Sequence, residues 1–226
     1  MLIYAKQPIY YIINNHPSKI KILYLSKDLD KKEYSRLMKM DFEVKRIPAE
    51  AAQKMSKNAN HQGFLAEVDE YKLQSYRSFF DSEFVLVLSS LTDVGNIGAI
   101  VRSAYALGVD SIIACGVKNL PLEPILRTST GALFDMPFAL EHNIHTVLND
   151  LKTSGFCVYG ADMGGEDIRD VVLTRKRVLV LGSEGEGLTS RVVSKLDKVV
   201  SIKMSHKFDS LNVSVAGAIL MDRMRI

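Results

Sequence analysis

Residues 178–188, Val-Leu-Val-Leu-Gly-Ser-Glu-Gly-Glu-Gly-Leu, are the most informative segment for the fold class. Four apolar residues in a row are typical of a strand buried on both faces, as in a parallel sheet. The loop that follows has three glycines, which allow positive φ and the close approach of a ligand. A buried strand that runs into a glycine-rich loop therefore indicates an α/β domain with a tight turn beside one strand end.

Other apolar runs in the second part of the chain resemble the first one. They occupy residues 84–88, 111–114, 157–159 and 199–202. Segments with helical spacing separate them, at residues 96–108, 144–154, 190–195 and 211–224. Because most of the runs are continuous rather than alternating, the pattern predicts βα units around a parallel sheet.

The first 70 residues predict a smaller α/β unit. Alternating patterns predict strands at residues 20–25, 42–47 and 64–68, and helical patterns occur at 7–15, 31–40 and from 48 onward. Residues 71–83 are polar and weakly periodic, which favours a linker. We therefore predict a domain at 1–70, a linker at 71–83 and a second domain at 84–226.

Charge and composition restrict the class of partner only loosely. The 226 residues carry a net charge of +3, and the first 70 contain 12 Lys and Arg against 9 Asp and Glu. The lysines of this unit form either an ordinary solvated surface or a face that contacts RNA phosphates. A nucleic-acid partner is compatible with this charge but is not required by it.

Several classes are disfavoured by what the chain lacks. No apolar run reaches the roughly 18 residues of a membrane helix, and the first residues have no secretion signal. The two cysteines lie within apolar runs, which favours buried reduced thiols, and five scattered His give no zinc spacing. We expect a cytoplasmic protein with no membrane segment and no metal site.

The glycine-rich loop at residues 182–188 is unsuited to phosphate. No Gly-Lys-Ser/Thr follows it, and it does not match Gly-x-Gly-x-x-Gly. Glu184 and Glu186 would repel a phosphate, whereas a carboxylate suits a hydroxyl, an amine or a cationic ligand. Taken alone, the loop is also compatible with an ordinary tight turn.

A second junction of strand and helix lies at residues 93–103, Asp-Val-Gly-Asn-Ile-Gly-Ala-Ile-Val-Arg-Ser. Asn96 is a candidate N-cap. Arg102 follows nearly two turns later on a mostly apolar helix, where an arginine is costly unless it is paired or faces a cleft. Both a snorkelling or ion-paired arginine and a site residue fit this pattern.

A third motif, Ser-Leu-Asn-Val-Ser-Val-Ala at residues 210–216, begins the last helical segment. Ser210 and Asn212 are residue types that cap a helix, and the small residues that follow allow close packing. These roles are sufficient to explain the motif by itself. The order and spacing of all three motifs are more specific.

Together the three motifs resemble the SpoU branch of the SPOUT RNA methyltransferases. The family pattern has Asn and Arg in the first motif, Gly and Glu in the second, and Ser-Leu-Asn at the head of a final helix. The sequence departs from it at Val94-Gly95, where Pro and His are frequent, and at Tyr105, where an acidic residue is common. It also has Tyr-Ala-Lys at residues 4–6, where Tyr-Gly-x-His is often found, and this departure bears on the rRNA site more than on the chemistry.

The resemblance implies a fold, a cofactor and an assembly. The second domain would be an α/β trefoil knot that binds S-adenosylmethionine, and the small N-terminal α/β domain, with its loop at 61–63, would bind substrate RNA. Such enzymes form homodimers, and the terminal helix and residues 96–108 are the candidate interface. No metal is needed, because the sulfonium of the cofactor is already activated.

The resemblance also implies roles for individual residues. Arg102 would act at the ribose 2′-hydroxyl, either by stabilising a developing alkoxide or as a base with a depressed pKa. The residues that would orient the reacting groups are Asn96, Glu184, Ser210 and Asn212. The cofactor contacts would come from Gly182, Ile202 and Leu211, with Met204, Thr130 and Gly131 completing the pocket. Phosphate contacts would come from Lys203, His206, Lys207 and Arg127.

The activity that this implies is 2′-O-methylation of RNA ribose, on a guanosine of large-subunit (23S) rRNA. A tRNA substrate is the first alternative, and the rRNA site whose methylation confers thiopeptide resistance is another. A non-catalytic RNA-binding assembly factor with a relict knot is a hypothesis of a different class. An unrelated nucleotide-using α/β enzyme is disfavoured by the missing phosphate-binding fingerprints.

Overall fold

The computed structural model describes residues 1–183, 185–206 and 210–226. The chain divides into two compact units. The first contains Met1–Lys72 and Leu122–Phe134, and the second contains Leu73–Pro121 and Asp135–Ile226. Residues 122–134 thus group with the first unit, although the sequence places them inside the second predicted domain.

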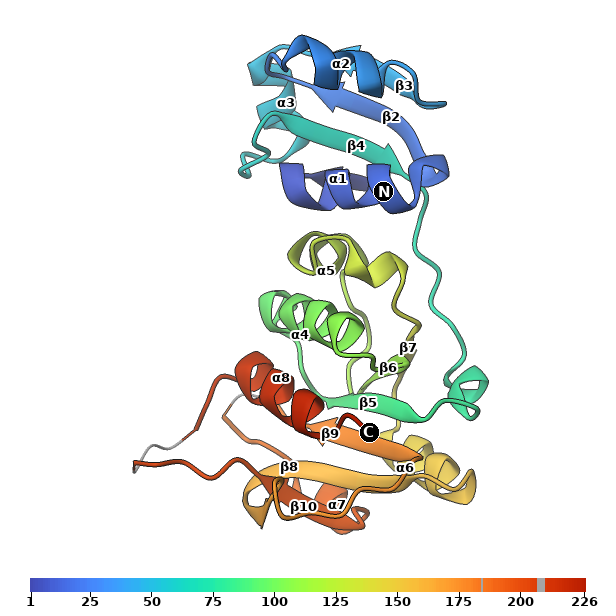
Figure 1. The fold of residues 1–226 in the computed structure, drawn as a ribbon, viewed down its shortest axis with the longest axis vertical. Helices are drawn as coiled ribbons and strands as arrows, with labels where there is room; N and C mark the ends of the chain where they lie inside the picture. Colours follow the sequence, from blue (N-terminus) through green and yellow to red (C-terminus); the bar gives the residue numbers. More distant parts are fainter. Residues whose placement is uncertain (184, 207–209) are drawn as a thin grey trace. The chain divides into compact units, whose positions relative to one another are not determined.

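The first unit is built on a four-stranded sheet with the strand order β1-β4-β2-β3 (Figure 1). β4 is antiparallel to both of its neighbours, and β2 and β3 are parallel. Its strands are β1 (Leu2–Tyr4), β2 (Ile20–Leu25), β3 (Glu43–Arg46) and β4 (Phe64–Val68). Its helices are α1 (Lys6–Asn15), α2 (Lys31–Leu37), α3 (Ala49–Met55) and α5 (Leu122–Thr128).

Two elements of this unit were not predicted from the sequence. β1 has only three residues, too few to show an alternating pattern, and it is recognisable only by its pairing with β4. α5 contains Pro124, which weakens a helical pattern in a short segment. α5 contacts β1, so the contact between two unpredicted elements brings residues 122–134 into the first unit.

The second unit contains a parallel sheet of six strands with the order β10-β8-β9-β5-β6-β7. Every residue of β5, β6 and β9 is buried, which confirms the inference drawn from their continuous apolar runs. The strand that was not predicted is β7, a four-residue edge strand. The strands are β5 (Phe84–Ser89), β6 (Ser111–Cys115), β7 (Phe138–Glu141), β8 (Cys157–Asp167), β9 (Arg177–Leu181) and β10 (Lys198–Ser201).

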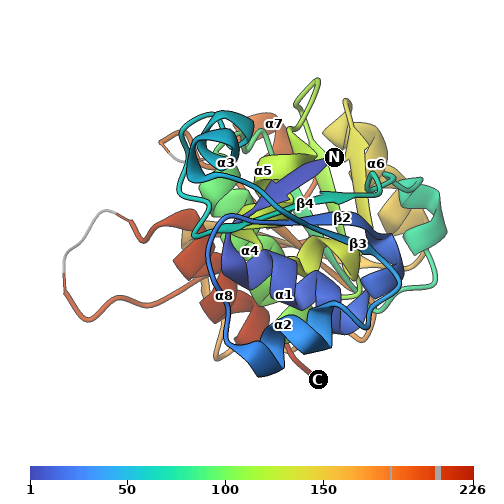
Figure 2. The ribbon, with the colours of Figure 1, turned by 90° about the horizontal axis from the view of Figure 1, so that it is seen from above.

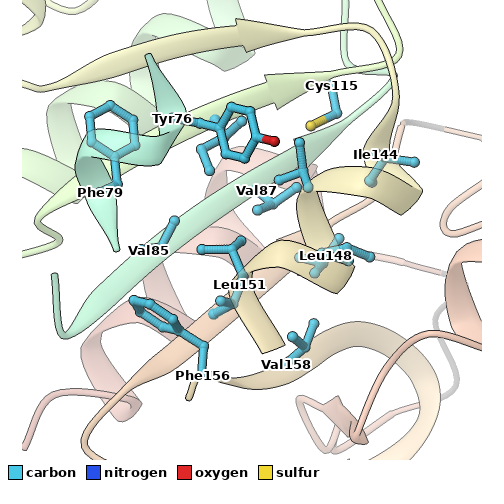
Figure 3. Packing of buried hydrophobic residues seen from close by; sticks show 14 of the residues in the cluster. Tyr76, Phe79, Val85, Val87, Cys115, Ile144, Leu148, Leu151, Phe156 and Val158 are labelled. Atoms are coloured by element: carbon cyan, nitrogen blue, oxygen red, sulfur yellow. The ribbon is translucent and has the colours of Figure 1, made fainter. Parts of the chain in front are cut away.

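Helices cover both faces of this sheet (Figure 1). On one face α6 (Ile144–Thr153) and α7 (Ser190–Val193) pack against side chains such as Val87 and Val180, and Figure 3 shows much of this cluster. On the other face α8 (Val213–Arg223) lies beside α4 (Val94–Ala106) in both ribbon views (Figures 1 and 2).

A glycine allows the close approach of α8. A Cβ at Gly217 would lie 2.8 Å from Leu181 of β9 and would also touch Ile100 of α4. Because this distance is shorter than real Cβ contacts, a larger residue would displace the buried Leu181 side chain. The small-residue face predicted for the last helix therefore serves packing at this position.

The predicted linker is partly incorporated into the second unit. Residues 76–79 form a short 3₁₀ turn whose Tyr76 and Phe79 are buried in the cluster of Figure 3. The Tyr76 hydroxyl donates a hydrogen bond of 2.7 Å to Asp150 of α6. Residues 73–83 are thus anchored, because two aromatic side chains are buried and one hydroxyl is bonded. Among the described residues, no helix is long and apolar enough to cross a membrane.

Candidate active site

A cavity of about 570 Å³ opens at the carboxyl ends of β8, β9 and β10. Ligands of α/β proteins commonly bind at this end of the strands, and the volume lies in the range of small-molecule sites. Residues of four segments line it: 161–163 within β8, 181–183 and 185–187 at and after the end of β9, 200–202 and 204 at and after the end of β10, and 210–213, 216 and 220 at the start of α8 and along it.

The glycine-rich motif folds back on itself beside this cavity. Gly187 N–H donates a 3.0 Å hydrogen bond to the Ser183 carbonyl, and the two residues form an antiparallel bridge. A Cβ at Gly182 would collide with the backbone of Gly187. Position 182 therefore requires glycine, because no side chain fits between the two arms of the loop.

Asn212 connects the third motif with the first. It is the N-cap of α8, and its side-chain oxygen accepts hydrogen bonds from the backbone N–H groups of Ser214 (2.9 Å) and Val215 (3.4 Å). Its Nδ2 donates a 2.9 Å hydrogen bond to Oδ1 of Asn96. The side chain therefore stabilises the start of α8 and holds it against α4, across 116 positions of sequence.

Asn96 is not the cap of α4, so that prediction was wrong. The helix begins at Val94, and the carboxylate of Asp93 accepts the 2.7 Å hydrogen bond from Asn96 N–H. Asp93 therefore satisfies the orphan N–H group at this helix start. The Asn96 side chain is consequently available to accept from Asn212.

Arg102 lies on the exposed face of α4, beyond the part of the helix that Asn212 contacts. The buried face of the same helix carries Ile97, Ile100 and Val101. Because Arg102 is exposed, it does not carry the desolvation cost that a buried arginine on this helix would have. Neither Arg102 nor Asn96 is part of the cavity wall.

The predicted cofactor contacts fall into two groups. Gly182, Ile202, Met204 and Leu211 line the cavity. Ser210 and Asn212, which were predicted to orient the reacting groups, line it as well. Thr130 and Gly131 do not line it. They follow α5 in the first unit, where a Cβ on Gly131 would lie 2.6 Å from the Tyr11 ring, so close packing accounts for that glycine.

The predicted phosphate contacts also lie in different parts of the chain. Lys203 and His206 are exposed in the segment that follows β10. Arg127 belongs to the first unit and lies 4.8 Å above the ring of Tyr4 as a cation–π pair. Glu184 and Lys207 lie outside the described residues.

The charge of the cavity favours a cationic ligand. Among the described lining residues, Asp162 and Glu186 are carboxylates, and none is Lys, Arg or His. Two carboxylates attract a cation and repel a phosphate. The wall also contains apolar side chains such as Leu181 and Leu220, so it suits a small molecule with both a cationic and an apolar part.

One wall of the cavity was not predicted from the sequence. Ala161, Asp162 and Met163 extend from β8 and line it. The available signal was the pair Gly164-Gly165 shortly after a buried apolar run, since paired glycines interrupt a strand. Nearby, hydrogen bonds from Arg169 lower the pKa of Asp167 to about 2.

The SpoU rRNA Methylase family model matches residues 83–222, and a model described as RNA 2′-O ribose methyltransferase substrate binding matches residues 2–74. The chain belongs to the SpoU rRNA methylase family. An uncharacterized tRNA/rRNA methyltransferase of Borreliella burgdorferi is 30% identical over 89% of this chain and 96% of its own length. A protein of Staphylococcus aureus assigned to the TrmH family of tRNA/rRNA methyltransferases is 29% identical over 93% and 89%.

Solved structures support the same fold. The SpoU methyltransferase AviRb of Streptomyces viridochromogenes, in complex with AdoMet, has a TM-score of 0.81 at 24% identity, over 99% of this chain and 88% of its own. An AdoMet-bound rRNA methyltransferase of Sinorhizobium meliloti has a TM-score of 0.79 at 21% identity, over 99% and 86%. The predicted SPOUT-type fold class, with a small α/β domain before the methylase domain, is therefore confirmed.

Proposed function

We propose that this SpoU family member is an S-adenosylmethionine-dependent RNA 2′-O-ribose methyltransferase that acts on a guanosine of large-subunit (23S) rRNA. The hydrogen bond between Asn212 and Asn96 carries the proposal. It joins the wall of an acidic cavity to the helix that bears Arg102, so a methyl donor and a ribose can be held side by side. The names of the relatives support RNA methylation.

The residues of the cavity fit the cofactor. S-adenosylmethionine supplies a methyl group on a positively charged sulfur. Asp162 and Glu186 complement that charge, and Gly182, Ile202, Met204 and Leu211 provide close backbone or apolar contacts. The two similar solved structures that contain AdoMet support this assignment.

Arg102 is the catalytic residue in this proposal. A free guanidinium stays protonated, so it stabilises negative charge that develops on the ribose 2′-oxygen better than it removes a proton. Asn96 and Asn212 are positioning residues, because their mutual bond fixes α4 against α8. Ser210 and Glu184 complete the set that orients the reacting groups, and much of the rate enhancement comes from that alignment.

The first unit supports an RNA substrate. Residues 2–74 match the substrate-binding model, and residues 1–70, with 12 Lys and Arg against 9 Asp and Glu, carry a formal excess equal to that of the whole chain. In the second unit, exposed Lys203 and His206 follow β10 beside the cavity and are suited to phosphate. tRNA is the second candidate, because the names of the relatives include both RNA classes.

The proposal includes a homodimer formed through α4 and α8. Large apolar side chains are exposed on both helices: Tyr105 is 45% exposed on α4, and Val215 and Ile219 are 48% and 36% exposed on α8. Val215 and Ile219 are four positions apart, so they share one face of the helix. A second copy that covers this face would remove the apolar surface from water.

The test is methyl transfer from labelled S-adenosylmethionine to separated 23S rRNA and tRNA, with mass spectrometry of the modified nucleoside. Arg102→Ala should lower transfer at least a hundredfold and leave cofactor affinity within about twofold, since Arg102 is outside the cavity wall. Arg191→Ala is the matched control, because Arg191 is also exposed on a helix but lies on α7.

Three results would contradict parts of this proposal. Turnover that survives in Arg102→Ala removes the assigned catalytic role. A 2′-O-methylated nucleoside in tRNA alone replaces the rRNA substrate with the tRNA alternative. Cofactor binding without transfer to free RNA or to ribosomal precursor particles identifies a non-catalytic RNA-binding protein instead.

A further inference from the structure

Two consecutive cations at the start of β9 bind the ends of helices on opposite faces of the sheet. Arg177 Nε donates a 2.7 Å hydrogen bond to the carbonyl of Met224, the C-cap residue of α8. Lys176 Nζ donates a 3.1 Å hydrogen bond to the carbonyl of Ser154, the C-cap residue of α6. Consecutive strand residues point to opposite faces, so each cation meets the helix on its own side. Each also complements the negative end of a helix dipole.

The guanidinium of Arg177 is buried and held by several groups. Arg177 is 6% exposed, and its Nη1 donates a second 2.7 Å hydrogen bond, to the Arg175 carbonyl. The guanidinium lies 4.5 Å from the centre of the Phe84 ring as a cation–π pair. Burial lowers the pKa of Arg177, whereas the carboxylates of Asp110 and Glu83 raise it, and the guanidinium stays charged. A buried charge requires such partners, so this side chain has one well-defined position.

The end of α8 that Arg177 binds is connected directly to the cavity wall. Met224 is fully buried, and its N–H donates a 2.9 Å hydrogen bond to the Leu220 carbonyl. Leu220 lies one turn earlier on the same side of α8 and lines the cavity. A single backbone hydrogen bond therefore joins the residue that Arg177 holds to a residue of the cavity wall.

Helix α8 is fixed along β9 at two points. Near the cavity, Gly217 packs against Leu181, which ends β9 and also lines the cavity. At the other end, Arg177 binds Met224. The four steps from residue 177 to 181 cover roughly 13 Å of strand, and the seven steps from 217 to 224 cover about 10 Å of helix. Two contacts so far apart oppose both sliding and tilting of the helix along the strand.

We propose that Arg177 is a positioning residue for the cofactor, because by binding the end of α8 it sets where Leu220 meets S-adenosylmethionine. This inference rests on the proposed function. Apolar packing is non-directional, so without the bond the last turns of α8 can shift and Leu220 loses contact with the ligand. The start of the helix keeps its place, because Asn212 binds Asn96 there.

The test measures the affinity for S-adenosylmethionine by titration calorimetry, and the steady-state kinetics of methyl transfer, at a temperature well below every Tm. Arg177→Met removes the donors and keeps a long apolar side chain beside Phe84. It should weaken S-adenosylmethionine binding about tenfold, as expected when a leucine loses about half of its contact with a ligand. The KM for S-adenosylmethionine should rise by a similar factor. The kcat should change by less than about twofold, because the Asn212–Asn96 bond is retained.

Lys176→Met is the matched control. Lys176 Nζ also donates to two carbonyls, those of Phe80 and Ser154, but on the face of α6. This variant should lower Tm, as Arg177→Met does, and leave the cofactor affinity within about twofold of the wild type.

Arg177→Lys keeps the charge and can still donate to the Met224 carbonyl, but it loses the planar fork that also reaches Arg175. Its affinity for S-adenosylmethionine should therefore lie between those of the wild type and Arg177→Met, about threefold below the wild type. The same loss decides the question if Arg177→Met does not fold.

Three results would overturn the inference. An unchanged affinity with a lowered Tm in the Arg177 variants shows that Arg177 only stabilises the fold. Equal losses of affinity in Arg177→Met and Lys176→Met show that any destabilised variant binds the cofactor less well. A lower kcat with unchanged affinity places the effect at the reaction instead of the cofactor. A failure of the proposed function is distinguishable, because the wild-type protein would then bind no S-adenosylmethionine, and the inference would fail with it.

Discussion

Removing the side chain of Asn212 should reveal how strongly the first and third motifs are coupled. In Asn212→Ala, α8 loses its N-cap, which costs about 1 kcal/mol of unfolding free energy. The hydrogen bond to Asn96 is exposed, so its loss adds only about 0.5 kcal/mol. The expected total of about 1.5 kcal/mol lowers Tm by about 3–6 °C for a chain of this size.

The separate contribution of the bond requires a double-mutant cycle. Asn96→Ala removes the bond but gains about 0.5 kcal/mol of helix propensity inside α4, so the single variant should be nearly neutral. In the cycle that propensity gain cancels, which leaves a coupling of about 0.5 kcal/mol. Differential scanning calorimetry of the wild type, both single variants and the double variant measures it.

Asn212→Asp provides the control. Aspartate caps helices as well as asparagine does, and the Asn96 amide can turn over and donate to the new carboxylate. Its Tm should therefore stay close to that of the wild type. A coupling of zero would show that the Asn96–Asn212 bond contributes nothing in solution, and an Asn212→Asp variant as unstable as Asn212→Ala would refute the capping role.

Two further predictions concern the loops around the cavity. Gly182→Ala should lower Tm by several degrees and weaken cofactor binding, because the new Cβ collides with the Gly187 backbone and costs about 1–3 kcal/mol of unfolding free energy. Scanning calorimetry measures the Tm and titration measures the cofactor affinity, and an unchanged Tm would contradict the prediction. Arg169→Ala should raise the pKa of Asp167 from about 2 towards its usual range near 4, as NMR titration of the carboxyl can measure. Since folding lowers this pKa, its contribution to stability is present above about pH 4 and is lost as the pH falls towards 2, and the effect is small because the Arg169 side chain is exposed.

The positions of most buried strands along the chain could be predicted from the sequence, because a strand that is buried on both faces is apolar at nearly every position. β5 and β9 are continuous apolar runs, and such runs predict a parallel sheet without knowledge of their partners. The glycine-rich loop was recognisable for a similar reason, since the backbone of Gly187 leaves no room for a side chain at Gly182. The motif residues Gly182, Leu211 and Asn212 line the cavity.

Features that depend on contacts between distant segments could not be predicted from the sequence. Asn96 and Asn212 are 116 positions apart, and nothing local indicates that Asn96 accepts a hydrogen bond from Asn212. The bulge at residues 161–165 of β8 exists because β10 pairs on both sides of it, and Thr130–Gly131 lies with the first unit because α5 contacts β1. Local sequence records burial and backbone strain at a single position, whereas pairing partners are set by the packing of the whole chain.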